Sequence, residues 1–247
     1  MILGMLGDNC RLTFFSIHGL NAVRLEEYPL DFSFMSEYYQ FYIEGAKITV
    51  TLAFFTVIVG FIFGLMLALL KLSKNKLLNF IATAYIEFIR GTPLLVQLYI
   101  VFYGLPHLGI SFPGLTAGVI ALSVNSAAYT AEIIRAGIQA VDKGQMEAAR
   151  SIGMGKTMSM RYIIIPQAVK NILPALGNEF ITIIKESSIA SIIGINELMF
   201  NADTIRGNTF KPFEPLIVVA VVYFILTFSL SKLMGYFERR MNTDDRG

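Results

Sequence analysis

The sequence predicts an all-α membrane protein with five transmembrane helices, its amino terminus outside and its carboxyl terminus in the cytoplasm. Three observations lead to this prediction. Of the 247 residues, 55% are hydrophobic and only 15% are charged, whereas a soluble domain carries about 25% charged residues. Several apolar stretches reach the ~20 residues that a helix needs to cross a bilayer. Finally, Lys and Arg gather in alternate connecting segments, as they do in cytoplasmic loops.

The first and last spans are the clearest. Ile48–Leu70 has 23 residues without a charge, and Pro215–Ser231 is a second uncharged stretch. Between Arg90 and Glu132 lie 41 uncharged residues, which are too many for one crossing. Gly and Pro concentrate in residues 104–114, which predicts a turn between two helices at that point.

The fourth span, Asn171–Asn196, is apolar but contains Glu179, Lys185 and Glu186. With this span included, we expect five crossings that are centred near residues 59, 93, 124, 184 and 223.

The distribution of basic residues predicts the orientation. With the amino terminus outside, the inside segments hold thirteen Lys and Arg residues and the outside segments hold five, as the positive-inside rule requires. We therefore expect an extracytoplasmic lead-in at residues 1–45, a transmembrane domain at 46–236 and a cytoplasmic tail at 237–247. Met35 is an alternative start of the chain.

The segment before the second span allows two interpretations. Residues 75–105 are longer than one crossing requires. Glu87 and Arg90 either form an ion pair in mid-membrane or belong to a helix along the cytoplasmic interface, which bends into the span at Arg-Gly-Thr-Pro. Pro93 removes a backbone donor and favours a break there. We favour the second interpretation.

Two sets of small residues predict close packing of helices. Gly60 and Gly64 lie four residues apart in the first span, and Ser123, Ala127 and Ala131 share a face of the third. Small residues at this spacing let two membrane helices approach closely.

Residues 135–170 form the largest cytoplasmic loop. Asp142 is a suitable N-cap for a helix in KGQMEAARSI. Gly153 and Gly155 can adopt the positive φ that ends a helix, and a second short helix, KTMSMRYIII, should stop at Pro166. Two short helices joined at a Gly-Met-Gly bend make a compact knob, which either docks into a cleft of another protein or is an ordinary helical loop.

The end of this knob, RSIGMGKT, resembles part of a phosphate-binding loop. A Walker A loop has the pattern G-x-x-x-x-G-K-[ST]. Gly155, Lys156 and Thr157 fit this pattern, but Arg150 stands where the first glycine is required. The preceding residues have the composition of an exposed helix, not of a buried strand. We therefore expect no nucleotide site in this chain.

The same loop resembles a known family. Glu147-Ala148-Ala149, followed by Gly153 and then by Ile165-Pro166, matches the E-A-A-x-x-x-G loop of ABC importer permeases. Three further stretches are similar to the permeases for glutamine, histidine, arginine and related polar amino acids, and they are EFIRGTPLLVQL (87–98), NSAAYTAEIIRAGI (125–138) and KESSIASIIGINEL (185–198). The resemblance covers about residues 40–240.

The resemblance implies a type I importer fold and a permease subunit that is not itself an enzyme. It implies that Glu147, Ala148, Ala149 and Gly153 belong to a coupling helix that rests in the cleft of an ABC ATPase. ATP and Mg²⁺ would be bound there, and this chain would hold no cofactor. The implied partners are ATPase subunits, a second permease copy or a sister permease, an extracytoplasmic amino acid-binding protein and the lipid bilayer, without nucleic acid. The implied location is the bacterial cytoplasmic (inner) membrane.

Polar side chains in two spans predict a substrate path between them, because a polar group in a bilayer is costly unless it faces a cavity or a partner. In the third span, Asn125, Tyr129 and Glu132 lie on one helical face. The candidates in the fourth span form a stripe or lie beside it, and they are Glu179, Thr182, Lys185, Glu186 and Ser188. Carboxylates would receive the α-ammonium group of an amino acid, and Lys185 or hydroxyls its α-carboxylate. The alternative is that Lys185 pairs with Glu132 or Glu186 and only joins helices.

These observations predict a transmembrane permease subunit of an ATP-driven amino acid importer. The excess of carboxyl groups over basic groups in the spans favours a neutral or cationic amino acid as the substrate. One alternative is a secondary transporter of a polar solute, but such folds usually contain internal repeats and we find none. A membrane-embedded enzyme is a weaker alternative, because no His-Glu-x-x-His pattern is present. His18 and His107 are far apart in loops and predict no metal site.

Overall fold

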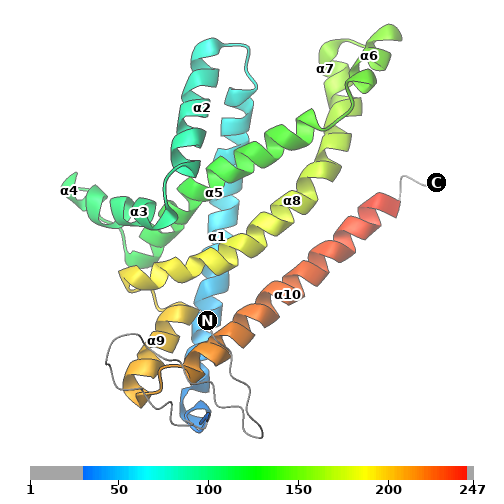
Figure 1. The fold of residues 1–247 in the computed structure, drawn as a ribbon. Helices are drawn as coiled ribbons and strands as arrows, with labels where there is room; N and C mark the ends of the chain where they lie inside the picture. Colours follow the sequence, from blue (N-terminus) through cyan, green and yellow to red (C-terminus); the bar gives the residue numbers. More distant parts are fainter. Residues whose placement is uncertain (1–29, 244–247) are drawn as a thin grey trace, which may run out of the picture. The chain divides into compact units, whose positions relative to one another are not determined.

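The structure, a computed structural model, describes residues 30–243 (Figure 1). Most of the predicted lead-in and residues 244–247 of the predicted tail lie outside this range. Within it, every element of regular secondary structure is a helix, as the sequence predicts. All of these helices lie in the unit that begins at Ser33.

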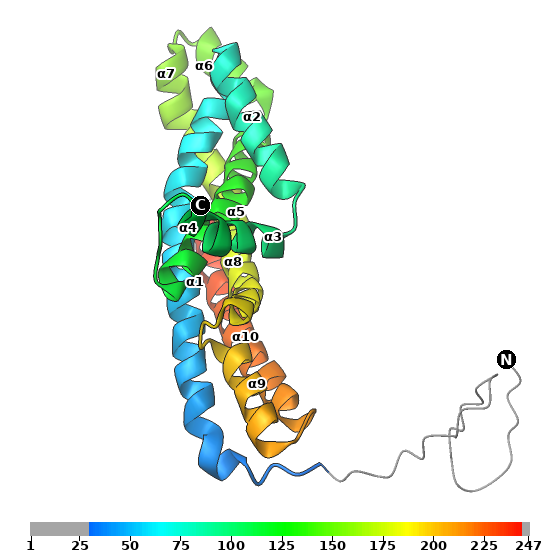
Figure 2. The same cartoon turned by 90° about the vertical axis from the view of Figure 1, so that its left-hand side faces the viewer.

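Four long helices make up most of this unit: α1 (Met35–Lys71), α5 (Gly114–Gln139), α8 (Ile165–Glu186) and α10 (Glu214–Thr243). The shorter α-helices between them are α2 (Lys76–Arg90), α3 (Leu94–Tyr99), α4 (Leu105–His107), α6 (Lys143–Ser151), α7 (Lys156–Ser159) and α9 (Leu198–Thr209). Two π-helical turns and one 3-10 segment complete the order, and they are η1 (Ile100–Gly104), η2 (Met160–Ile164) and η3 (Ser187–Ile193). Helices α6 and α7 lie at the same end as the α1–α2 turn, and α9 lies at the opposite end (Figure 1, Figure 2).

Three helical stretches are long and apolar enough to cross a membrane: Met35–Lys71, Gly114–Gln139 and Glu214–Arg240. The bent pair Lys76–Arg90 and Leu94–His107 makes a fourth if its two halves count as one span. Among the described residues, α8 does not meet the same standard because its polar residues lower its hydropathy. The length and composition of these helices therefore indicate a membrane protein. The count of five spans and the orientation remain predictions.

The close approach of α1 to α5 depends on two glycines. A Cβ atom on Gly60 would lie 2.9 Å from Ser126 Cβ, and one on Gly64 would lie 2.6 Å from Thr130 Cβ. Only glycine fits at such separations, so the predicted packing role of this pair is confirmed. The predicted row of small residues on α5 is also buried, and it consists of Ser123, Ala127 and Ala131.

The predicted break at Arg-Gly-Thr-Pro is a bend of 105° between α2 and the α3–α4 segment. Pro93 stands at the N-cap of α3 with an extended backbone, as expected for a residue that cannot continue the previous helix. In the described part of the chain, no ion pair joins Glu87 to Arg90. The Arg90 guanidinium lies 3.9 Å from Glu132 instead, so the interpretation of Glu87 and Arg90 as an ion pair is wrong.

A buried glutamine joins the two sides of this bend. Gln97 Nε2, on α3, lies 2.8 Å from the Ile89 carbonyl oxygen, 2.9 Å from Thr92 Oγ1 and 3.1 Å from the Thr92 carbonyl oxygen. Gln97 Oε1 accepts a hydrogen bond from Asn125 Nδ2 on α5 at 3.0 Å. Gln97 is 5% exposed and Asn125 is 7% exposed. Because buried amides are costly to leave unpaired, this pair fixes the bend against α5.

The loop between α5 and α8 confirms one predicted turn and corrects two other expectations. Gly153 has a φ of 87° after α6, as predicted, but Gly155 has a φ of −66° and is the N-cap of α7. The helix that begins at Lys156 does not stop at Pro166. It continues through η2 into α8, and Pro166 lies in the first turn of α8. A proline is tolerated there because its missing N–H has no partner in a first turn, and the preceding π turn accommodates the change in hydrogen bonding.

At the other end, α9 begins at a buried glutamate. Glu197 accepts hydrogen bonds from the backbone N–H groups of Met199 at 2.9 Å and Phe200 at 2.8 Å, and from Tyr223 OH on α10 at 2.9 Å. Thr49 Oγ1 on α1 accepts the backbone N–H that follows Glu197, at 3.2 Å. Such charge-assisted bonds are strong, and they join α1, α9 and α10.

We expect Gly64→Ala to destabilise the helical bundle, because the added methyl group must displace Thr130 and α5 with it. Overpacking of a filled interior costs about 1–3 kcal/mol. Thermal unfolding of the purified chain in detergent measures the change. Gly207→Ala in α9 is the matched control, since nothing lies within 4 Å of its Cβ position. Equal unfolding midpoints for the two variants would contradict the packing role of Gly64.

We expect Gln97→Met to lower stability by about 1–3 kcal/mol, since it keeps the volume but leaves the Asn125 amide without its buried partner. The double variant Gln97→Met/Asn125→Leu should lose less than the sum of the single variants. Unfolding midpoints in detergent measure all three, and Gln40→Met at an exposed position is the control. Additive effects would show that the two amides do not act as a pair.

Candidate functional site

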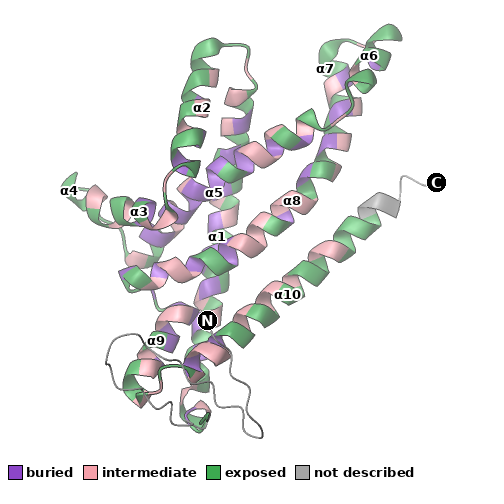
Figure 3. Cartoon of the chain, in the orientation of Figure 1, coloured by how far each residue is buried: buried purple, intermediate pink, exposed green. Residues whose placement is uncertain are grey.

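Helices α6 and α7 form the knob that the loop predicts. Asp142 Oδ1 accepts a backbone N–H at 2.6 Å and caps α6. Three of the four predicted coupling residues, Glu147, Ala148 and Gly153, are exposed. The fourth, Ala149, is 4% exposed, and Figure 3 shows that most of α6 is exposed. Ala149 therefore anchors the helix, while its neighbours present a surface.

The turn after α6 is fixed by its backbone. The Ala149 carbonyl accepts Met154 N–H at 3.1 Å, and the Arg150 carbonyl accepts Gly153 N–H at 3.1 Å. The φ of 87° at Gly153 is one that residues with a Cβ atom rarely adopt. A hollow of about 520 Å³ adjoins α6, between the end of α5 and η2. The knob thus has a defined shape and a surface of small and charged side chains.

Glu132 lies where α1, α2 and α5 meet, and three cations surround it. Lys71 Nζ is 2.5 Å from Glu132 Oε1, Arg135 Nη2 is 2.8 Å from Oε2, and Arg90 Nη1 is 3.9 Å from Oε2. Glu132 is paired with these groups and not with Lys185, so that alternative for Glu132 is wrong. Because charge-assisted hydrogen bonds already occupy both oxygens, this carboxylate has little capacity left for a substrate ammonium group.

The other two candidates on α5 face the same way. The Arg90 guanidinium lies 5.5 Å from the centre of the Tyr129 ring, within the range of a cation–π interaction. The side-chain amide of Asn125 donates a hydrogen bond to Gln97. Asn125, Tyr129 and Glu132 therefore share a face, as predicted, and this face meets α2 and α3.

The candidates on α8 are less fully paired. Glu179 lies near Ser126 of α5 and near Glu186, whose like charge repels its carboxylate. Lys185 and Glu186 are both exposed, and their opposite charges attract. Ser188 Oγ donates to the Lys185 carbonyl oxygen at 2.8 Å.

The two predicted sets lie in separate places in this single chain. Thr182 is half-buried on the α8 stripe, and the stripe meets α5 at Ser126. Within residues 30–243, no hydrogen bond or ion pair joins the α8 stripe to Asn125, Tyr129 or Glu132. The role of both sets in a substrate path stays a prediction, and α8 carries the polar groups that still have binding capacity.

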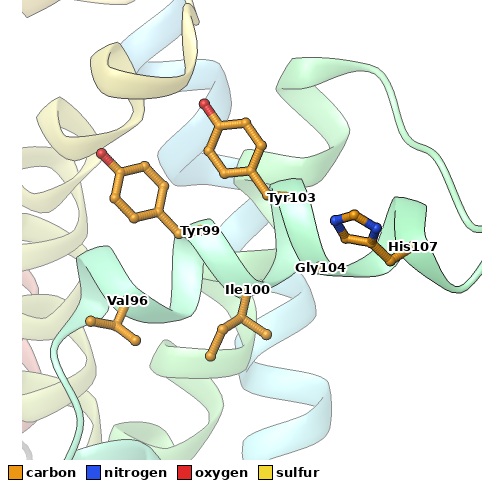
Figure 4. Close-up of a pocket in the computed structure, with 6 residues that line it drawn as sticks. All are labelled: Val96, Tyr99, Ile100, Tyr103, Gly104 and His107. Carbon is orange, nitrogen blue, oxygen red and sulfur yellow. The ribbon is translucent and has the colours of Figure 1, made fainter.

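An open hollow of about 420 Å³ lies on the α3–η1–α4 segment (Figure 4). Figure 4 shows Tyr99 and Tyr103 on the same side of this segment, with their ring centres 5.6 Å apart. None of the predicted path residues lines this hollow. His107 lines it, and His18 lies outside the described residues. Over the described range, no three His, Cys, Asp or Glu side chains are grouped as metal ligands would be.

Sequence reasoning did not single out three residues that the structure connects to the candidates. Lys71 ends an uncharged stretch and looks like a boundary marker, yet it reaches Glu132. Gln97 is a lone amide in an apolar segment, which is a signal of a buried hydrogen bond. Ser126 gives no signal in sequence, because its contact with Glu179 depends on how α8 crosses α5.

The segment RSIGMGKT begins in the last two residues of α6 and continues into α7. It therefore lacks the buried strand that precedes a Walker A loop. Lys156 and Thr157 are exposed at the start of α7.

Comparison with known proteins gives a consistent result. Residues 60–243 match the family described as binding-protein-dependent transport system inner membrane component. The arginine transport system permease protein ArtQ of Bacillus subtilis (strain 168) is 42% identical over 217 residues, which are 87% of this chain and 99% of that protein. A protein of Rickettsia bellii (strain RML369-C), which carries the name of a glutamine transport system permease protein, GlnP, is 45% identical over 202 residues, or 81% of this chain and 93% of its own length.

Solved structures agree with the sequence matches. A crystal structure of an amino acid ABC transporter with histidines superposes with a TM-score of 0.83 at 55% identity, over 85% of this chain and 99% of that one. The inward-facing MetNI methionine ABC transporter shares the fold, with a TM-score of 0.71 at 20% identity, over 86% of this chain and 99% of that chain. The family match covers well over half of the residues. The chain therefore belongs to the family of binding-protein-dependent transport system inner membrane components.

Proposed function

We propose that this chain is the transmembrane permease subunit of an ATP-driven amino acid importer. The exposed α6 knob carries the proposal, because it displays the E-A-A-x-x-x-G residues on a fixed turn at one end of the bundle. Relatives that are named as amino acid permeases and cover most of the chain support it.

In this proposal the knob transmits force from a partner. Glu147 and Ala148 are exposed on α6, so an ABC ATPase that binds and hydrolyses ATP–Mg²⁺ can grip the helix there. The buried Ala149 and the glycine turn at Gly153 fix α6 against η2 and α7, and η2 continues into α8, so a push on α6 moves a long helix as well. A flexible loop would absorb the same displacement.

The proposed path runs along α8. Glu179 and Glu186 would receive the ammonium group of the amino acid, and Lys185, Thr182 or Ser188 its carboxylate. The carboxylates outnumber the single lysine on this stripe, which suits a neutral or cationic amino acid. The Asn125–Tyr129–Glu132 face contributes by positioning α2 and α3 beside the path.

The assembly we propose follows from these surfaces. A second copy of the chain or a sister permease would cover the exposed charges of α8, and an extracytoplasmic amino acid-binding protein would deliver the substrate at the α9 end. The complex would lie in the bacterial inner membrane, with the amino terminus outside and the knob and carboxyl terminus in the cytoplasm. The arrangement of basic residues supports this orientation.

We expect Glu147→Arg to reduce ATP-driven uptake by roughly tenfold or more, a loss of about 1.4 kcal/mol of coupling. The substitution reverses a charge on the face proposed to contact the ATPase and leaves Ala149 in place. Uptake by reconstituted complexes measures it, with subunit composition checked by size-exclusion chromatography. Lys74→Glu, an exposed charge reversal in the α1–α2 turn, is the matched control. Full uptake by an intact Glu147→Arg complex would sink the coupling role.

We expect Glu186→Gln to reduce uptake of a cationic amino acid more than that of a neutral one. The difference should be roughly three- to tenfold, or about 0.7–1.4 kcal/mol, as for a partly exposed ion pair. Glu87→Gln on the exposed face of α2 is the control. Glu132→Gln should instead lower the unfolding midpoint, since Lys71 and Arg135 lose their partner. If Glu186→Gln affects both substrates equally, the charge argument for the path fails.

The alternative of a secondary transporter has its own test. The purified chain, reconstituted without other subunits and given a proton or sodium gradient, should accumulate no amino acid. Gradient-driven accumulation by the chain alone would refute the importer assignment.

A further inference from the structure

The loop between α9 and α10 exposes two phenylalanines. Phe210 is 91% exposed and Phe213 is 60% exposed. Within residues 30–243, Phe210 is also the only residue other than glycine with a positive φ, at 55°. It occupies the left-handed position that ends a helix, where Gly or Asn normally stands because a Cβ atom is unfavourable. A turn alone does not explain a large apolar ring at a strained and almost fully exposed position, so we looked for a function of this side chain.

Hydrogen bonds hold this loop in shape. Arg206 Nε donates to the Pro212 carbonyl oxygen at 2.9 Å, and Arg206 Nη1 lies 2.6 Å from Asp203 Oδ1. Thr209 Oγ1 donates to a carbonyl one turn earlier on α9 at 2.7 Å. The exposure of Phe210 is therefore a property of a fixed loop and not of a frayed helix end.

The loop lies beside the first residues of α1. Lys211 Nζ is 3.3 Å from Ser33 Oγ and 5.5 Å from the centre of the Phe34 ring. Tyr42 OH donates to the Pro215 carbonyl oxygen at 3.4 Å. Pro215 opens the uncharged stretch of α10. The apolar part of α10 thus begins directly after the loop, at the level of Tyr42.

Exposed apolar side chains continue from this level along both neighbouring helices. On α10 they include Val221, Phe224, Ile225 and Phe228, and on α1 they include Tyr39, Phe41 and Ile43. The exposed apolar face of a membrane helix contacts lipid, and aromatic rings concentrate where the hydrocarbon meets water. Phe210 and Phe213 stand at the edge of such a face.

We propose that the Phe210–Phe213 loop inserts both phenylalanine rings into the interfacial layer of the lipid leaflet at this end of the bundle. Burial of the Phe210 ring in lipid offsets the unfavourable backbone conformation. This anchoring is independent of the proposed transport function.

A lipid surface fits the loop better than a protein partner does. Both rings directly precede an apolar helix and share their level with the exposed aromatic side chains of α1. The exposed apolar residues of α10 follow this loop within about two helical turns, beginning with Val221. The rings and the apolar face of α10 form one continuous surface, which a single lipid leaflet can cover.

The absence of tryptophan from the sequence permits a direct test. Phe210→Trp gives the full chain a single tryptophan, and the variant is reconstituted in phosphatidylcholine vesicles with bromine either near the headgroup or near the chain end. We expect the shallow bromine to remove roughly half of the emission, and the deep bromine to remove clearly less, as for a residue of the aromatic belt. Acrylamide in the water should quench weakly. Phe213→Trp repeats the measurement at a second position in case Phe210→Trp does not fold.

Two further variants calibrate the result. Phe224→Trp, on the exposed face of α10, reports contact with lipid chains, and Ile152→Trp, exposed at the end of α6, reports water. If both loop variants are quenched by acrylamide as strongly as Ile152→Trp and not by either bromine, the anchoring is refuted. Shielding that appears only after an amino acid-binding protein is added would also overturn it and assign the loop to that protein.

Discussion

The contact between α1 and α5 is the constraint on which the rest of this structure depends. In lipid, helices associate through close packing and not through exclusion of water, so the missing side chains at Gly60 and Gly64 decide how near the two backbones lie. At this distance α5 becomes the centre of the unit. Its remaining surface meets α2 through a buried apolar cluster that includes Ile86 and Ala128, meets α3 through Asn125, and meets α8 at Gly137, where Ile172 fills the space of a side chain. Every candidate for function is placed relative to this one helix.

The polar groups divide into two kinds once α5 is in place. Glu132, Asn125 and Glu197 are each bonded to at least one side chain from another element, and paired polar groups of this kind stabilise a buried site. Their role is to join helices. Glu179, Lys185 and Glu186, on α8, have fewer partners, and Lys185 and Glu186 are exposed at its end. Full pairing therefore marks the groups that hold the helices, and incomplete pairing is the observation on which the proposed substrate path along α8 rests.

Much of the architecture could be predicted from the sequence because its signals are local. An uncharged stretch, an aspartate N-cap, the glycine pair and the Arg-Gly-Thr-Pro break each determine the structure within a few residues of themselves. The prediction that a helix stops at Pro166 was wrong because proline occurs both after the end of a helix and in the first turn of one. Only the π turn at Met160–Ile164 distinguishes the two cases. The partners of Glu132 could not be predicted, since Lys71 is far away in sequence. The packing of α5 on α1 decides which face of α5 meets α2, and no pattern of neighbouring residues in the sequence predicts that face.

Helix α8 shows why the single chain needs a protein partner in a membrane. It lacks the apolar character of a crossing, it contains Pro174, and it ends in a charged pair followed by a 3-10 segment. Charged groups in a bilayer are tolerated only where they face water or protein. Helix α10 lies beside α8, but only 6% of its most apolar stretch is buried. Lipid can cover α10 but cannot cover Lys185 and Glu186. A water-filled path bounded by a second permease would give Lys185 and Glu186 a polar environment and leave α10 in contact with lipid. The charged residues that make α8 a poor membrane span are therefore the physical argument that this chain pairs with a second permease.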